Sequence, residues 1–196
     1  MPRSIDHESR RGQITDATRR VIARSGLEAA TFQAVAQEAG ISIRLVQYYF
    51  GSKGEFLAAT RRAVAADAAA RFGDALSALD ESAPARERIS AILTEMVPID
   101  DRRRSDAIVL AAFHAASLTT PVDGPALPTA PQALVDIIAA QIPQDPGSRH
   151  GARDRHLDAE LILATAAGLV QGMIAGHYEP ATVTALIDRL LDALGL

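Results

Sequence analysis

The chain has 196 residues, enough for one large domain or two small ones, and 48% of them are hydrophobic, which is ample for a packed core. It has no cysteine, so disulfides, thiolate metal sites and a cysteine nucleophile are excluded. The net charge of −4 is unevenly spread: residues 1–55 carry a surplus of two positive charges and residues 56–196 a surplus of six negative ones, so a polyanion would be met at one end only.

Helical periodicity dominates the sequence, and alternation of β-branched residues is nearly absent. We therefore expect an all-α fold of about nine helices. In the N-terminal part, Gly26 should stop the first helix, Thr31 should cap the second, Gly40 should end it, and Ser52 should cap the fourth. The first four expected helices are 9–25, 32–39, 43–49 and 53–80.

Prolines divide the rest of the chain. The fifth helix should start beside Pro84 and end before Pro98, Pro121 should stop the sixth, and Pro180 falls in the first turn of the ninth. Two loops, PVDGPALPTAP and PQDPGSRHGARD, are rich in turn residues and should flank the seventh helix. The last four expected helices are 101–119, 130–141, 155–177 and 180–194.

The second and third expected helices have the size of a DNA-binding helix-turn-helix. A small residue, Ala36, stands where the two helices must approach, and Gly40 tolerates the positive φ that the turn needs. Apolar anchors flank both of these positions: Val35, Ala39, Ile41 and Val46. An ordinary helical hairpin in a bundle is the alternative interpretation.

The aromatic run Tyr48, Tyr49 and Phe50 is sorted by helix phase. Phe50 follows Val46 by four residues and should share its core face, Tyr49 lies at the border, and Tyr48 should point outward. The other outward residues are Arg44, Leu45 and Gln47. Glutamine can read adenine, arginine can read guanine or bind phosphate, and apolar side chains can touch thymine methyls.

The run T-F-x-x-V-A-x-E-A-G-I-S-x-x-x-V-Q-Y-Y-F-x-S-K-x-E-F-L resembles the TetR family of bacterial repressors, most specifically in YYFGSKGEFL. The resemblance implies that Lys53, the only lysine, and the helix that begins there hold a DNA phosphate. It implies phosphate contacts for Thr31, Tyr48 and Tyr49. It also implies base-edge contacts for four residues of the third helix, Ile43, Arg44, Leu45 and Gln47. The complete predicted DNA-binding set is Thr31, Gln33, Ser42, Ile43, Arg44, Leu45, Gln47, Tyr48, Tyr49 and Lys53.

The segments LTEMVPIDDRRRSDAIVLAAFHAASL and LDAELILATAAGLVQGMIAG resemble the C-terminal domain of the BetI-like branch of that family. The resemblance implies a DNA-binding domain over residues 1–52 and an effector-binding and dimerisation domain over residues 53–196. It also implies a homodimer in which the eighth and ninth helices pair with their mates in a four-helix bundle.

Small residues recur every four positions along the eighth helix, which would let two backbones approach closely. Close packing within the monomer is the alternative, and the ninth helix carries an apolar stripe of its own. The predicted dimer interface consists of Ala164, Gly168, Gly172, Gly176, Leu186 and Leu190.

Candidate effector contacts lie on the fifth, sixth and eighth helices: Met96, Leu110, Phe113, His114, Ser117 and Met173. The alternatives are a plain core role for the Met and Phe side chains and a singly hydrogen-bonded core or interface role for His114. The arginine run 102–104 should pair with the surrounding Asp100, Asp101 and Asp106.

We therefore expect a DNA-binding transcriptional regulator, a repressor that a small molecule releases from a palindromic operator. The alternatives are an activator or dual regulator, or a small helical enzyme; the sequence contains no H-E-x-x-H, G-x-S-x-G or G-x-x-x-x-G-K motif. No cofactor or metal is expected, although His150, Asp154, His156 and Asp158 are loosely spaced like ligands. The start of the chain lacks the apolar core of a secretory signal, and we expect that no apolar run approaches the length of a membrane span, so we expect a cytoplasmic protein.

Overall fold

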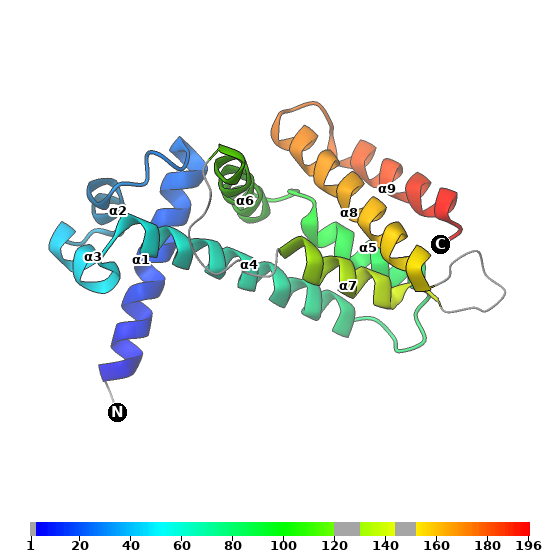
Figure 1. Ribbon diagram of the computed structural model, residues 1–196, viewed down its shortest axis with the longest axis horizontal. Helices are drawn as coiled ribbons and strands as arrows, with labels where there is room; N and C mark the ends of the chain where they lie inside the picture. The colour runs from blue at the N-terminus through cyan, green and yellow to red at the C-terminus, as the bar shows by residue number, and fades with distance from the viewer. Residues whose placement is uncertain (1–2, 120–129, 144–151) are drawn as a thin grey trace. The chain divides into compact units, whose positions relative to one another are not determined.

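The computed structural model describes residues 3–119, 130–143 and 152–196, and within these ranges the chain forms nine α-helices and no strand (Figure 1). The all-α prediction is confirmed. The helices are α1 (Arg3–Ser25), α2 (Phe32–Ala39), α3 (Ile43–Phe50), α4 (Lys53–Ser77), α5 (Ala85–Met96), α6 (Asp101–Thr119), α7 (Ala130–Gln141), α8 (Ala152–Ile174) and α9 (Pro180–Leu194).

The bounds of α2, α6, α7 and α9 agree with the predicted ranges, and those of α3 differ by one residue. Three predictions miss by more. The first helix begins at Arg3 rather than at residue 9, α4 ends at Ser77 rather than at residue 80, and α8 lies three residues earlier than expected. The N-terminal error arose because the apolar periodicity starts late in α1, whose first half is polar.

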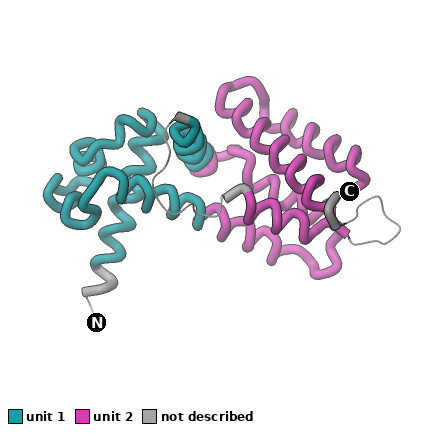
Figure 2. Tube along the Cα trace, viewed as in Figure 1, with its two compact units in different colours: residues 1–67, 105–121 teal, residues 68–104, 122–196 magenta. Residues whose placement is uncertain are grey.

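The chain packs as two compact units (Figure 2). Unit 1 consists of residues 1–67 and 105–121, and unit 2 of residues 68–104 and 122–196. Helices α4 and α6 therefore each contribute to both units. The predicted functional boundary between residues 52 and 53 remains a prediction.

The core of unit 1 joins α1, α2 and α3 to the first half of α4 and to part of α6. Its fully buried side chains include Ile14, Val35, Phe56 and Val109, one from each of four helices. Burying large apolar side chains of this kind contributes about 1.5–3 kcal/mol each. This core fixes the elements that carry the predicted DNA contacts.

An arginine on α1 crosses this core to two carboxylates. The Arg19 guanidinium lies 2.6 Å from the Asp67 carboxylate of α4 and 3.4 Å from the Asp106 carboxylate of α6, which is buried. Asp106, which is predicted to pair with the neighbouring arginine run, therefore also contacts an arginine of α1. Within that run, Arg103 pairs with Asp100 at 3.1 Å as expected, and also with Glu95 at 2.9 Å.

In unit 2, α5, α7, α8 and α9 pack around one apolar cluster, against which Phe72 and Leu76 of α4 also pack. Ile89, Ile138, Ile162 and Leu191 supply a fully buried side chain from each of these four helices. Arg86 at the start of α5 donates to the Asp192 carboxylate at 2.8 Å and to the Leu196 carbonyl at 2.9 Å, which holds the end of α9.

The four predicted small residues of α8 turn out to have different roles. Gly176 lies beyond the helix with φ +77°, and the His177 N–H donates to the Gly172 carbonyl, so Gly176 ends α8 rather than continuing its face. A Cβ on Gly172 would collide with the Tyr178 ring of the same chain. Ala164 and Gly168 are exposed, and a Cβ on Gly168 would meet nothing.

Within the described ranges one helical segment, Arg155–Ile174, is long and apolar enough to cross a membrane, with a mean hydropathy of 1.4. The expectation that no stretch approaches this length is therefore wrong. In the fold, 39% of its most apolar window is buried. A core helix of a soluble protein has the same length and composition, so this is weak evidence for a membrane span.

Candidate nucleic-acid interface

Helices α2 and α3 and the turn between them have the geometry of a helix-turn-helix. Gly40 has φ +67°, and the Ile41 N–H donates to the Ala36 carbonyl at 3.0 Å, which closes α2 and starts the turn. Ala36 is buried where the helices approach. The Ser42 hydroxyl then accepts from the Leu45 N–H at 3.2 Å and caps α3.

Helix α3 has one buried face and one exposed face, as the phase argument predicts. Val46 is fully buried and Phe50 is 1% exposed, whereas Tyr48 is 76% exposed. Arg44 is also exposed and forms no hydrogen bond or ion pair with any described residue. Other exposed side chains of this face are Ile43 and Gln47, while Leu45, predicted to point outward, is half-buried.

Tyr49 lies at the border between the two faces, where the sequence places it. It is half-buried, and its ring packs on that of His7 with 4.7 Å between centroids. The Tyr48 ring meets the Tyr49 ring edge-on at 5.2 Å. Tyr49 therefore links the exposed Tyr48 to α1.

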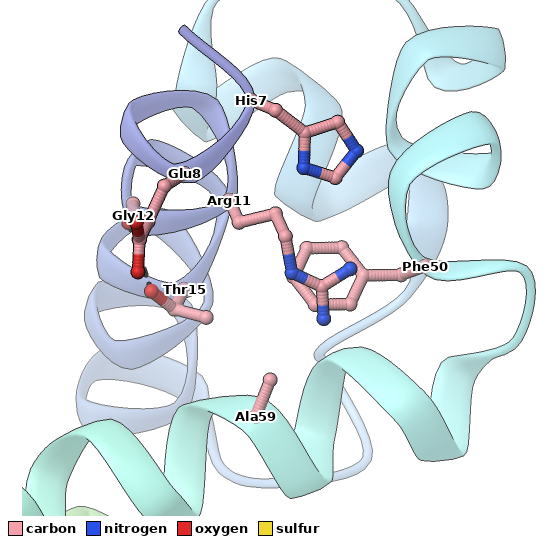
Figure 3. Close-up of a pocket in the computed structure, with 7 residues that line it drawn as sticks. All are labelled: His7, Glu8, Arg11, Gly12, Thr15, Phe50 and Ala59. Atoms are coloured by element: carbon pink, nitrogen blue, oxygen red, sulfur yellow. Dashed lines mark hydrogen bonds between the residues drawn. The ribbon is translucent and has the colours of Figure 1, made fainter. Parts of the chain in front are cut away.

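Helix α1 holds the C-terminal ends of both helices of the motif. The Arg11 guanidinium donates to the Tyr49 carbonyl at 2.5 Å. It also lies 4.1 Å from the centre of the Phe50 ring, over which Figure 3 shows it. Gln13 donates to the Ala39 carbonyl at 2.8 Å. These are the carbonyls that a helix leaves without partners at its end. Periodicity gave no signal for these contacts, since both side chains lie off the apolar face of α1.

Beside Arg11 an open recess of about 540 Å³ lies against α1, α4 and the end of α3. Figure 3 shows the Arg11 side chain reaching across it toward Phe50. The lining residues are His7, Glu8, Arg11, Gly12, Thr15, Phe50 and Ala59. Among the residues that the structure describes, no cluster of three or more His, Asp or Glu side chains could hold a metal ion.

The start of α4 presents Lys53 beside the turn between α1 and α2. The Ser52 hydroxyl accepts from the Glu55 N–H at 3.2 Å and caps the helix. The Lys53 ammonium donates to the Glu28 carbonyl at 3.3 Å and lies 3.6 Å from the Glu28 carboxylate. Thr31, three residues after Glu28, is the N-cap of α2. Its hydroxyl accepts from the Ala34 N–H at 3.1 Å, and the residue is exposed.

All ten predicted DNA contacts thus lie in unit 1, at the start of α2, along α3 and at the first residue of α4. Most of them are exposed; Leu45, Tyr49 and Lys53 are half-buried. Whether these ten residues contact DNA stays a prediction.

The six predicted effector contacts are divided between the two units. Leu110 and Phe113 pack against the core of unit 1, while Met96 and Met173 belong to the core of unit 2. His114 and Ser117 are exposed on α6, where the Ser117 hydroxyl donates to the His114 carbonyl at 2.7 Å. The effector set remains a prediction. Of the four residues with ligand-like spacing, His150 and the side chain of Asp154 lie outside the described residues.

The sequence matches the family model of bacterial regulatory proteins of the tetR family over residues 14–60, and that of the C-terminal domain of BetI-type transcriptional repressors over residues 85–196. The chain belongs to the TetR family. The resemblance inferred from YYFGSKGEFL and from the C-terminal segments is therefore confirmed.

Curated relatives of the chain are named as HTH-type transcriptional regulators. The chain is 38% identical over 115 residues to the regulator PksA of Bacillus subtilis, covering 59% of this chain and 55% of PksA. It is 37% identical over 122 residues to the regulator BetI of Burkholderia cenocepacia, covering 62% of this chain and 54% of BetI. The matched part thus spans little more than half the length of these curated relatives.

A crystal structure of a transcriptional regulator from Rhodococcus sp. Rha1 superposes with a TM-score of 0.80 at 26% identity, covering 93% of this chain and 94% of that one. Within the TetR family match, residues 14–60 contain every predicted DNA contact. The supporting residues His7, Arg11 and Gln13 precede it.

Proposed function

We propose that this TetR-family chain is a cytoplasmic transcriptional regulator that binds a palindromic DNA operator as a homodimer and represses transcription until a small-molecule effector releases it. The observation that carries the proposal is that α3 has one buried face and one exposed face. Its buried residues fix it to unit 1, and its other face offers Arg44, Gln47 and Tyr48 to a groove.

The exposed face of α3 suits the major groove, which admits an α-helix. Gln47 can accept and donate to adenine, Arg44 can bind guanine or phosphate, and Ile43 can touch a thymine methyl. Tyr48, Thr31 and Lys53 would bind phosphates on either side. Phosphate contacts supply affinity and register, whereas the base contacts of α3 supply specificity.

A homodimer is supported by an apolar face of α8 that the monomer leaves open. Leu157, Leu161, Ala164 and Gly168 are all exposed, and their spacing places them on one side of the helix. On α9, Leu186 is also exposed. Two-fold pairing through α8 and α9 would cover this surface and would double the number of base contacts. Gly172 and Gly176 have roles within the monomer and are not needed for this face.

For the effector, unit 2 offers Met96 and Met173, whose flexible side chains adapt readily to ligands. Release requires that the effector prefer the DNA-incompetent state, and moving a population from 1:99 to 99:1 needs about 5.5 kcal/mol of differential affinity. An activator or dual regulator would use the same DNA-binding surface.

The test is binding of the purified protein to the DNA upstream of its own coding sequence, followed by fluorescence anisotropy at several salt concentrations. Tyr48→Ala and Lys53→Ala should weaken binding with little change in the far-UV spectrum. Lys53→Ala should also lower the steepness of the plot of log K against log salt by about 0.9 per protomer, because one phosphate contact is lost.

Arg62→Ala is the matched control, since it removes an exposed cation from the same helix at a position with no predicted phosphate contact. Unchanged affinity and salt dependence in both test variants would refute the proposed DNA surface. Light scattering at micromolar concentration tests the dimer, and a monomeric mass would refute it.

A further inference from the structure

The single lysine of the chain is already bound to an anion of its own fold. Its ammonium is 3.3 Å from the Glu28 carbonyl oxygen and 3.6 Å from the Glu28 carboxylate. The Glu28 side chain is 97% exposed, so no packing holds the carboxylate in this place. What keeps it near Lys53 is the attraction between the two charges.

The pair lies among the proposed phosphate contacts. Glu28 is in the turn between α1 and α2, three residues before Thr31, and Lys53 is the first residue of α4. A phosphate that reached Lys53 would arrive on the same ammonium that the carboxylate contacts. Two anions cannot both sit there without repulsion, because a pair of unit charges about 4 Å apart repels by about 1 kcal/mol even in bulk water.

We propose that Glu28 sets the DNA affinity of this protein by competing with the DNA backbone for Lys53. In the free protein the carboxylate neutralises the ammonium, and on binding it must give way to phosphate and turn into solvent. The proposal rests on the proposed function, and it assigns a role to a residue outside the ten predicted DNA contacts.

The consequence is weaker binding to every duplex, whatever its sequence. Phosphate contacts carry no base information, so a carboxylate that weakens one lowers affinity for operator and non-operator DNA alike. Glu28 thereby limits the time that the protein spends on non-operator DNA and leaves the discrimination by Arg44 and Gln47 unchanged.

Because the effect is independent of sequence, its test needs no operator. The probe is a fluorescein-labelled, mixed-sequence duplex of about 40 base pairs, titrated with the full chain between about 50 and 200 mM salt. Glu28→Gln should bind about two- to fivefold more tightly per protomer, the range expected for an exposed ion pair. The salt dependence should steepen, since Lys53 then meets phosphate with its full charge.

Two further variants separate competition for Lys53 from a general loss of negative charge. Asp16→Asn removes one exposed carboxylate of α1 that has no contact with Lys53, and it should change the affinity by less than about 1.5-fold. In the Lys53→Ala background, Glu28→Gln should recover less than half of its effect, because the two residues act through one interaction.

An equal increase in DNA affinity in Glu28→Gln and Asp16→Asn would overturn the inference. An undiminished increase on adding Glu28→Gln to the Lys53→Ala variant would also overturn it. So would unchanged affinity in Glu28→Gln. If Lys53→Ala weakens binding while Glu28→Gln does nothing, the proposed DNA surface stands and only the role of Glu28 fails. If the unmodified protein binds no duplex at any salt concentration, the proposed function itself fails.

Discussion

Substitutions at Tyr48 and at Phe50 on α3 should separate DNA binding from folding. Phe50→Ala removes a ring that is 1% exposed, lies under the Arg11 guanidinium at 4.1 Å and meets the Phe56 ring edge-on at 6.4 Å. Tyr48→Ala removes a ring that is 76% exposed. The substitutions are chemically similar, and they lie two positions apart on one helix.

The magnitudes follow from burial. A buried aromatic side chain covers about 150–250 Å², which at about 25 cal/mol per Å² gives a transfer term of about 4–6 kcal/mol, of which alanine retains part. Phe50→Ala should therefore lower the free energy of unfolding of unit 1 by about 3–5 kcal/mol. Tyr48 has about a quarter of its surface buried, so Tyr48→Ala should cost about 1 kcal/mol or less.

The assay is urea unfolding followed by far-UV circular dichroism, because the chain has no tryptophan to report on folding. DNA binding is measured on the same samples. We expect Tyr48→Ala to unfold near the native midpoint and to bind DNA weakly, and Phe50→Ala to unfold at clearly lower urea. The reasoning fails if Phe50→Ala loses less than about 1 kcal/mol, or if Tyr48→Ala is destabilised as much.

Two further predictions concern other contacts. Gly172→Ala should lower the stability of unit 2 by about 1–3 kcal/mol, because the new Cβ overlaps the Tyr178 ring, and an unchanged melting temperature would show that the ring moves aside freely. Hydrogen bonds from Arg20 and Arg24 lower the pKa of Glu38 below its ordinary value of 4.5, so its stabilising effect is present above that pH and is lost as the pH falls through the folded-state pKa. Glu38→Gln should therefore be less stable than the native protein around pH 7, and the difference should shrink as the pH falls below 4.5. A difference that stays constant with pH would contradict this.

Helix bounds could be predicted wherever a local signal marks them. Thr31 and Gly40 delimit α2 to the residue, and Pro180 marks the start of α9, because caps and breakers act on the few residues beside them. The first turns of α1 carried no such signal. They are polar, and what packs against them, the Tyr49 ring on His7, comes from 42 positions further along the chain.

The exposed face of α3 could be predicted for the same reason, since helix phase depends only on neighbours in sequence. The carboxylate beside Lys53 could not be predicted, because Glu28 is 25 residues away and its contact depends on how α1, α2 and α4 pack. The glycine spacing in α8 misled for a related reason. A four-residue repeat shows that small residues share a face, but Gly172 faces Tyr178 of its own chain and Gly176 ends the helix.

The rotation of α3 about its own axis is set before any DNA arrives. Each residue turns the helix by about 100°, so a slip of one position would move Tyr48 toward the core and bring Phe50 toward solvent. Phe50 packed under Arg11 opposes that slip, and the bond from Arg11 to the Tyr49 carbonyl fixes the end of the helix against α1. Both contacts lie within unit 1. An effector that acts by moving one unit against the other therefore need not disturb the exposed face of α3. If the proposed effector releases DNA in this way, it should alter the affinity for whole operators far more than that for a single half-site.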